Sequence, residues 1–310
     1  MKVFLFICLG CLILVLLIIA IYLIIGYSLY KSTLSKNSKM KRKIEENHKV
    51  YLKNMGIDET YFNNEFSKIY LQSFDNLKLC GFYKNKGYNK LAILIHGFGG
   101  CHLDMAEYSK LFDDKGYDIL AIDLRSHGES EGDFVSLGEQ EERDLQFWIE
   151  KMLEINQEYK IALFGISLGA STVCLAASNK NLSNKVVLAV EDCGFDSVDK
   201  EVSYQFGKRK FHFPVFLKIF YSYMKKTKKI DLKHNDISKA LKNSKIPILF
   251  IHGDSDSFVP TEMVFNLYNS LPEHRRSVYI SKGAGHIKSY RTNPSEYKAK
   301  LYGFLNEYNM

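Results

Sequence analysis

The 310-residue sequence is poor in the residues that mark fibrous and linker proteins. Five prolines and twenty glycines are too few for a collagen or a Pro/Gly-rich linker, and no segment repeats at a fixed period. The six cysteines form no C-x-x-C pair, so the usual zinc-site spacings are absent. With 46% hydrophobic and 25% charged residues, the composition is that of a globular protein. The length fits one large α/β domain or two small ones.

Charge is missing altogether from residues 3–30. In a helix that rises about 1.5 Å per residue, this run is long enough to cross a bilayer core, which takes about 20 apolar residues. It exceeds the apolar part of a signal peptide, which has about 7–15 residues, and no A-x-A-like cleavage site follows it. The run therefore predicts an uncleaved transmembrane anchor over residues 1–30.

Basic residues gather on the C-terminal side of this anchor. Residues 31–53 hold eight basic and two acidic side chains, whereas only Lys2 and the α-amino group precede the apolar run. The positive-inside rule then places the rest of the chain in the cytoplasm. Residues 31–66 are expected to form a basic juxtamembrane stalk with some helix, facing anionic headgroups.

Residues 67–310 are predicted to form one α/β domain. Two alternating segments, 68–74 and 77–83, indicate a β-hairpin. Continuous apolar runs, typical of buried parallel strands, recur at 91–95, 117–122, 161–164, 186–190 and 246–251. Amphipathic stretches of helical length lie between them. This alternation predicts a mostly parallel central sheet with helices on both faces.

Residues 196–245 interrupt the alternation, because fifty residues exceed the usual connection between a helix and a strand. We expect a helical lid insertion packed over the sheet; an ordinary pair of crossover helices is the alternative. The segment holds thirteen basic and five acidic residues and an aromatic run of Tyr204, Phe206, Phe211, Phe213, Phe216, Phe220, Tyr221 and Tyr223. This excess of positive charge suggests contact with an anionic surface. The alternative is an ordinary solvated face of a lysine-rich protein. No nucleic-acid partner is expected, because no recognition motif accompanies the charge.

Ser167 lies in the sequence Gly165-Ile166-Ser167-Leu168-Gly169, between a predicted strand and a predicted helix over 168–178. This is the G-x-S-x-G pattern in the strand–turn–helix setting that it requires. A side chain at either glycine would clash on such a turn, which raises the serine hydroxyl above the sheet. The Leu168 N–H, at a helix N-terminus, would point toward an oxyanion formed there. We therefore expect Ser167 to be a nucleophile.

A serine hydroxyl needs a histidine base that is held by an acid. Asp254 and Asp256 both follow the apolar strand 248–251, where a carboxylate can point into the crevice at the strand ends. His286 follows a predicted strand at 278–280 and lies beside glycines. These residues alone leave Asp254 and Asp256 as alternative acids.

Four motifs together resemble the α/β-hydrolase superfamily, in particular its membrane-anchored serine hydrolases of the monoacylglycerol-lipase and serine-aminopeptidase-like branch. They are the Ser167 turn, an acid and histidine in the order Ser, Asp, His, and two loops, His96-Gly97-Phe98-Gly99-Gly100 and Asp123-Leu124-Arg125-Ser126-His127-Gly128-Glu129-Ser130. The resemblance covers about residues 68–308. Ser126 stands where the loop of the family usually has glycine.

The resemblance implies a role for each residue. Ser167 would be the nucleophile, and His286 the general base and then the general acid. Asp256, rather than Asp254, would orient His286, because the family places this acid three residues after the glycine of its H-G-x-x-D motif. The N–H groups of Phe98 and Leu168 would form the oxyanion hole. Structural or loop contacts are expected for His96, His127, His252, Glu191 and Asp192. Neither a cofactor nor a metal is expected.

These features predict a single-pass membrane serine hydrolase that cleaves carboxylic esters through an acyl-enzyme. The anchor and the aromatic, basic lid favour a lipid-like or amphipathic ester, such as an acylglycerol or a lysophospholipid. One alternative is a peptidase or amidase of the same fold, which would need an acid for the substrate amine from among Asp196, Asp199, Glu201, Asp231 and Asp236. The other is a catalytically inactive, membrane-tethered binding module.

Overall fold

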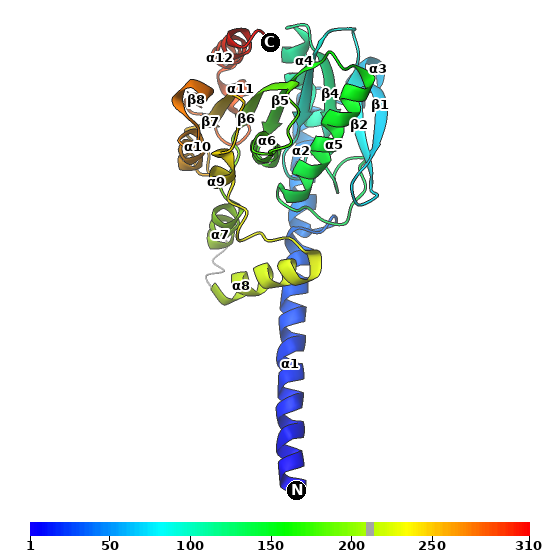
Figure 1. Ribbon diagram of the computed structural model, residues 1–310, viewed down its shortest axis with the longest axis vertical. Helices are drawn as coiled ribbons and strands as arrows, with labels where there is room; N and C mark the ends of the chain where they lie inside the picture. Colours follow the sequence, from blue (N-terminus) through cyan, green and yellow to red (C-terminus); the bar gives the residue numbers. More distant parts are fainter. Residues whose placement is uncertain (209–213) are drawn as a thin grey trace.

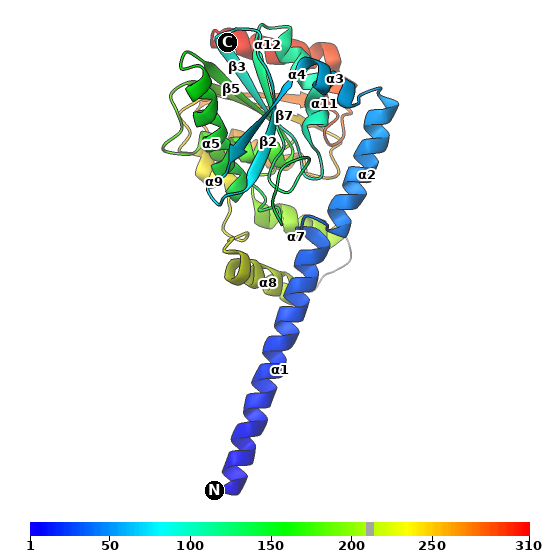
Figure 2. The ribbon, with the colours of Figure 1, turned by 90° about the vertical axis from the view of Figure 1, so that its right-hand side faces the viewer.

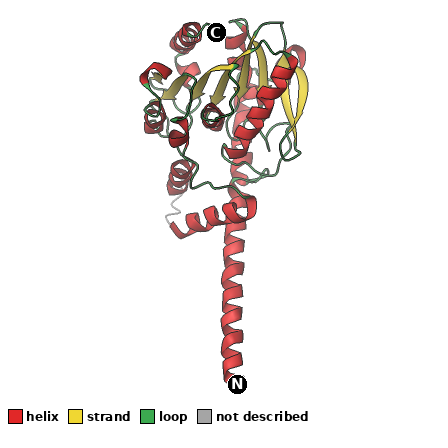
Figure 3. Cartoon of the chain, viewed as in Figure 1, coloured by secondary structure: helices red, strands yellow, loops and turns green. Residues whose placement is uncertain are grey.

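The computed structural model describes residues 1–208 and 214–310. A single long helix, α1 (Lys2–Thr33), extends away from a domain that holds all the strands (Figures 1 and 3). The most apolar part of α1 has a mean hydropathy of 3.4, and none of it is covered by the rest of the chain. Helix α1 is thus long and apolar enough to cross a membrane, as the uncharged run predicts.

The domain is built on one eight-stranded sheet in the order β1-β2-β4-β3-β5-β6-β7-β8. β1 and β2 form the predicted hairpin, β2 is antiparallel to β4, and every other neighbouring pair is parallel. The predicted mostly parallel sheet is therefore confirmed. The strands are β1 Ser67–Gln72, β2 Lys78–Lys84, β3 Lys90–Ile95, β4 Asp118–Ile122, β5 Lys160–Ile166, β6 Val186–Asp192, β7 Ile248–Gly253 and β8 Arg276–Ser281.

Helices cover both faces of the sheet because the buried strands are apolar on both sides. In β3, Leu91, Ile93 and Ile95 belong to one core cluster, and Ala92 and Leu94 belong to the other. Helices α5 (Glu139–Ile155) and α6 (Leu168–Ala177) contribute to the first cluster, and α4 (Ala106–Asp113) and α12 (Pro294–Glu307) contribute to the second. Shorter helices are η1 His102–Met105, α10 Glu262–Tyr268, η3 Glu273–Arg275 and α11 Ser289–Thr292.

Residues 31–66, the expected stalk, contain α2 (Lys39–Asn54) and α3 (Glu59–Glu65). Helix α2 continues from the end of α1 in roughly the same direction and lies along the domain (Figure 2). Its Ile44 packs so closely on the 97–100 turn that a Cβ added at Gly99 would lie 2.7 Å from the Ile44 Cγ2. His48 Nδ1 lies 3.1 Å from an Asp104 carboxylate oxygen. This segment is therefore packed on the domain over the length of α2.

Between β6 and β7 the chain forms α7 (Val198–Lys208), α8 (Pro214–Tyr223), a π-helical turn η2 (Met224–Lys228) and α9 (Ile237–Leu241). Phe211 and Phe213 of the aromatic run lie outside the described residues. Helix α8 packs crosswise on α1, well away from the sheet (Figure 1). Tyr22 Oη donates a hydrogen bond of 3.1 Å to Ser222 Oγ at this crossing. The sequence predicts an insertion over the sheet, but it does not predict this contact with α1.

Candidate active site

The turn at Ser167 has the strained geometry that its glycines anticipate. Ser167 follows β5 directly and adopts a φ of 53°, a conformation that L-residues rarely take. A Cβ at Gly165 would lie 2.3 Å from the backbone of Gly169, and one at Gly169 would lie 2.2 Å from the Ile95 carbonyl oxygen. Only glycine fits at these two positions, so β5 can pass directly into α6 with Ser167 at the carboxyl edge of the sheet.

Ser167, His286 and Asp256 form a continuous row of hydrogen bonds. Ser167 Oγ donates to His286 Nε2 over 2.9 Å, and His286 Nδ1 donates to Asp256 Oδ2 over 2.7 Å. The three residues follow β5, β8 and β7, whose carboxyl ends meet at one edge because these strands run parallel. The ring of Phe258 stacks on His286 with its centroid 4.8 Å away. The structure thus brings together the three residues that the resemblance selects.

Asp256 accepts hydrogen bonds from His286 and from backbone N–H groups, whereas Asp254 accepts a hydrogen bond from a different loop residue. The other carboxylate oxygen of Asp256 accepts the backbone N–H groups of Phe258 and Val259 at 2.8 and 3.0 Å. Burial would raise the pKa of Asp256, but hydrogen bonds from His252 and His286 outweigh it and hold this pKa well below its usual range. Asp254 instead accepts the Gly283 N–H at 2.7 Å. The geometry therefore separates the two acids that the sequence leaves open.

The 97–100 turn lies beside Ser167. A Cβ at Gly97 would lie 3.1 Å from the Ser167 Cβ, and Phe98, Ser167 and Leu168 line one cavity. Leu168 begins α6, and the first N–H groups of a helix have no acceptor within it. The two backbone groups expected to bind an oxyanion thus flank Ser167.

His96 and His127 pin this turn through backbone hydrogen bonds, as a structural role requires. His127 Nε2 accepts the Gly99 N–H at 3.0 Å, and its Nδ1 donates to the Arg125 carbonyl at 2.9 Å. His96 Nε2 accepts the Leu124 N–H at 3.0 Å. Burial, together with the neighbouring His96, holds the pKa of His127 well below its usual value. Neutral rings are required here, because each ring both donates and accepts.

The loop after β4 explains why Ser126 can replace glycine. Ser126 has a φ of 65°, in the left-handed region that favours glycine. Its hydroxyl donates to the Phe134 carbonyl at 2.8 Å, and its N–H donates to the Glu131 carbonyl at 2.9 Å. These two bonds hold the strained residue in place, so the loop keeps its conformation despite the substitution.

A buried polar cluster behind Asp256 was not anticipated by the sequence. His252 Nε2 lies 3.3 Å from Asp256 Oδ2 and 3.0 Å from the Val259 carbonyl. Glu191 accepts the Gly194 N–H, and burial raises its pKa to about 8. Asp192 accepts the Tyr297 hydroxyl at 2.9 Å, and burial raises its pKa to about 6. Glu191 and Asp192 make loop and core contacts as expected, but the contact of His252 with Asp256 carries no sequence signal beyond a histidine at a strand end.

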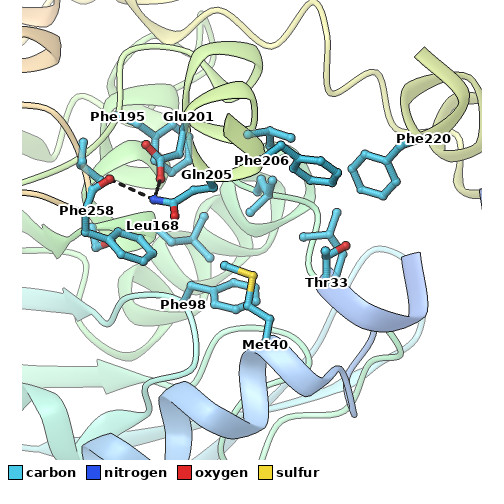
Figure 4. A pocket seen from close by; sticks show the side chains of 15 residues that line it. Thr33, Met40, Phe98, Leu168, Phe195, Glu201, Gln205, Phe206, Phe220 and Phe258 are labelled. Carbon is cyan, nitrogen blue, oxygen red and sulfur yellow. Dashed lines mark hydrogen bonds between the residues drawn. The ribbon is translucent and has the colours of Figure 1, made fainter. Parts of the chain in front are cut away.

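An apolar cavity adjoins Ser167. Helix α7 contributes Val202, Gln205 and Phe206 to its walls, and α8 contributes Phe220 (Figure 4). Gln205 donates to Glu201 at 2.7 Å and to the Phe258 carbonyl at 2.9 Å. The remaining lining residues are Thr33, Leu34, Met40, Phe98, Leu137, Leu168, Phe195, Glu201, Phe258 and Val259.

Thr33, Leu34 and Met40 come from the N-terminal segment, which sequence reasoning did not place at the site. They belong to the end of α1, the residue after it and the first turn of α2. A weak signal was available, because Met40, Ile44 and Tyr51 recur on one face of an otherwise lysine-rich helix. That face is the one that packs on the domain.

Two groups of side chains within the described residues have ligand atoms close enough to hold a metal ion. In the first, Asp123 accepts the His102 N–H at 2.7 Å and lies 3.0 Å from its Nδ1, with Cys101 beside them. The second combines Cys193 with Asp256 and His286 of the hydrogen-bonded row. Because the carboxylates and rings already bond to one another, the geometry fits hydrogen-bonded clusters better than metal centres.

The chain is similar to known proteins over most of its length. Residues 88–190 match the family described as serine aminopeptidase, S33. An uncharacterized Bacillus subtilis protein, YqkD, is 26% identical over 264 residues, which are 77% of this chain and 83% of that protein. An uncharacterized protein of Acanthamoeba polyphaga mimivirus, R595, is 25% identical over 77% of this chain and 81% of its own length.

Solved structures share the fold at lower identity. An esterase of Pyrococcus furiosus has a TM-score of 0.67 at 22% identity, covering 81% of this chain and 94% of its own. A membrane phospholipase A, described as a bacterial virulence factor, has a TM-score of 0.58 at 18% identity, with 100% and 99% coverage. The sheet and these matches establish that this chain has the α/β-hydrolase fold.

Proposed function

We propose that the chain is a serine hydrolase that cleaves carboxylic esters, with lipid-like or amphipathic esters such as acylglycerols or lysophospholipids as its substrates. The observation that carries the proposal is the hydrogen-bonded row from Ser167 through His286 to Asp256 beside an apolar cavity. A nucleophile, its base and an orienting acid are the groups that acyl transfer needs.

In the first half of the reaction, Ser167 Oγ would attack the ester carbonyl while His286 Nε2 takes its proton. Asp256 would keep its charge and stabilise the imidazolium, which its depressed pKa supports. The oxyanion would accept the N–H groups of Phe98 and Leu168. His286 would then give its proton to the departing alcohol, which leaves the acyl group on Ser167. Water would release the acid by the same steps.

The walls of the cavity favour an apolar acyl group. Phe206 and Phe220 line it on one side, and Phe98 and Phe258 line it on another (Figure 4). Removing an alkyl chain from water contributes about 0.8 kcal/mol per buried CH₂, so such walls reward longer chains. The candidate membrane span α1 leads to the same cavity, which supports a substrate taken from among lipids. The structural similarity to a membrane phospholipase A is consistent with this substrate class.

The first test is hydrolysis of p-nitrophenyl esters from acetyl to palmitoyl by the full chain in detergent, beside Ser167→Ala. We expect Ser167-dependent turnover that rises toward medium or long acyl chains. Turnover confined to acetyl and butyryl would contradict a lipid ester. A folded protein that binds these esters without turnover, unaffected by Ser167→Ala, would favour the inactive binding module instead.

One observation favours a peptidase or amidase as the second candidate. Of the five acids in the insertion that could receive a substrate amine, Glu201 is the one among the residues lining the cavity. Asp196 is instead bonded to Lys200 and Asn266, Asp231 to Lys225, and Asp236 caps α9. Faster cleavage of an aminoacyl-nitroanilide than of esters, with a raised KM in Glu201→Gln, would support this candidate.

We also propose that α1 anchors the chain and that the domain lies on the cytoplasmic side. The excess of lysine after the span supports this orientation. In sealed inside-out vesicles, added protease should digest the domain, and in right-side-out vesicles it should not. The reverse pattern would overturn the proposed orientation.

A further inference from the structure

Helix α8 occupies a fixed position on α1. A Cβ at Gly26 would lie 2.6 Å from the ring of Tyr223, so the α1 backbone packs directly on this ring of α8. Tyr22 bonds to Ser222 at the same crossing, and the Lys228 ammonium lies 4.6 Å from the centre of the Tyr30 ring. Helix α8 is therefore held against the part of α1 between Tyr22 and Tyr30.

This part of α1 is where a membrane-spanning helix would leave the bilayer. At about 1.5 Å per residue, residues 3–22 span about 30 Å, the thickness of a hydrocarbon core. Tyr22, Tyr27 and Tyr30 then fall in the headgroup layer, where tyrosine is enriched. Because α8 crosses α1 at this height, it would lie in the same layer and parallel to the membrane (Figure 1).

The composition of α8 and η2 suits that layer. Residues 214–230 contain five lysines and no acidic residue. The Val215 side chain is 60% exposed on the outer surface of α8, and Lys218 is exposed one turn further along. An apolar residue beside lysines is the pattern of a helix that lies in the interface and binds anionic lipid.

The cavity at Ser167 extends to the end of α1 and to α8. Phe220 of α8 and Thr33 at the end of α1 lie together at one end of the cavity, and Phe258 beside His286 lies at the other (Figure 4). Helix α8 thus provides both an exposed outer surface and an inner wall of the cavity.

We propose that α8 lies in the headgroup layer of the bilayer that α1 crosses, and that the cavity takes its ester directly from that leaflet, with the end of α1 as one wall. This inference rests on the proposed function for the identity of the substrate. In this arrangement the outer surface of α8 contacts the lipid bilayer. The placement of α8 is independent of catalysis and is tested separately.

The placement is tested by fluorescence of the full chain in phosphatidylcholine–phosphatidylglycerol vesicles whose acyl chains carry bromine near the glycerol backbone. The one native tryptophan, Trp148, is fully buried and gives the baseline. Ile155→Trp is the matched control, because Ile155 is 47% exposed but precedes β5, at the sheet edge opposite Ser167. We expect at least a third of the added emission of Val215→Trp to be quenched, and none of that of Ile155→Trp. Equal quenching of the two variants would overturn the placement and assign the outer surface to water or another protein.

Delivery from the leaflet is tested with Val215→Asp and its control Ile155→Asp. We expect Val215→Asp to hydrolyse a long-chain ester embedded in the vesicles at least tenfold more slowly than the wild type, with p-nitrophenyl butyrate in solution hydrolysed at the wild-type rate. Ile155→Asp should match the wild type on both esters. Wild-type turnover of the embedded ester by Val215→Asp would overturn delivery through this surface. If the wild type hydrolysed neither ester, the proposed function would fail and delivery with it, while the quenching result would stand.

Discussion

The two sides of the cavity at Ser167 are built in different ways. On one side, Ser167, Asp256 and His286 follow parallel strands of the central sheet, and hydrogen bonds join the three side chains in a row. On the other side, the walls come from the ends of α1 and α2 and from α7 and α8, which contact the cavity through apolar side chains. The difference suggests that reactivity is set by the sheet edge, and that the choice of substrate is set by helices, of which α2 continues from the candidate membrane span and α8 packs on it.

The largest expected effect is that of Ser167→Ala, on the sheet side of the cavity. Ser167→Ala should lower kcat for p-nitrophenyl butyrate by about 10⁴-fold or more, because the nucleophile of a triad cannot be replaced by water at comparable rates. Its thermal unfolding midpoint should stay close to that of the wild type, since the hydroxyl makes one hydrogen bond, to His286. Residual activity within tenfold of the wild type would contradict the assignment of the nucleophile.

A second prediction concerns the stability of the same edge. Gly169→Ala places a Cβ 2.2 Å from the Ile95 carbonyl oxygen, and a backbone atom cannot move aside cheaply. We expect a loss of about 3 kcal/mol or more in unfolding free energy, measured as the thermal unfolding midpoint of the full chain in detergent. Gly303→Ala in α12 is the control, because no atom lies within 4 Å of the added Cβ. It should raise stability by about 0.4–1 kcal/mol.

The buried cluster behind Asp256 predicts a pH dependence of stability. The pKa of Glu191 is raised by burial to about 8, from an ordinary value of 4.5. The folded state therefore keeps this proton up to about pH 8, whereas the unfolded state releases it near pH 4.5, so stability falls as pH rises between these values. Glu191→Gln has no proton to lose, and its unfolding midpoint should fall less steeply from pH 5 to pH 8. Parallel curves for the two proteins would show that Glu191 is ionised in the folded state.

The smallest expected effect concerns the contact between α2 and the 97–100 turn, where the two sides of the cavity meet. Ile44 of α2 packs on Gly99 in the turn that carries Phe98, so Ile44→Asp should loosen one oxyanion donor. We expect kcat to fall about tenfold for short and long esters alike, which is less than the 10²–10³-fold cost of losing a donor completely. Val50→Asp on the same helix is the control, because Val50 is 62% exposed. A similar loss in both variants would mean that α2 acts through its overall charge.

The sheet side was largely predictable from the sequence, because its signals are local. Continuous apolar runs marked five of the parallel strands, and the glycines around Ser167 marked the turn that only glycine permits. The residues alone could not choose between Asp254 and Asp256. That choice depends on which carboxylate faces His286 after the β7 and β8 loops meet, and the resemblance supplied it before the geometry did.

The helical side was only partly predictable, because it depends on contacts between distant segments. The lysine-rich residues 31–66 suggested a stalk, yet Met40 lines the cavity and Ile44 packs on the 97–100 turn. The crossing of α8 over α1 joins Tyr22 to Ser222 across two hundred positions of sequence. The apolar face of α2 is a weak local signal that does not show what it packs against, and the crossing of α8 has no local pattern. Only the folded arrangement reveals that the end of α1 contributes to the cavity.

The most direct test of the central claim is covalent labelling of the full chain with a long-chain alkyl fluorophosphonate, in which a serine oxygen bonds to phosphorus and fluoride leaves. The account predicts a single adduct by intact mass, located on the Ser167 peptide and abolished in Ser167→Ala. It also predicts labelling that is slowed at least a hundredfold in His286→Ala, because the base that activates the hydroxyl is then missing. Labelling on another residue, or labelling of Ser167 at the same rate without His286, would contradict the account.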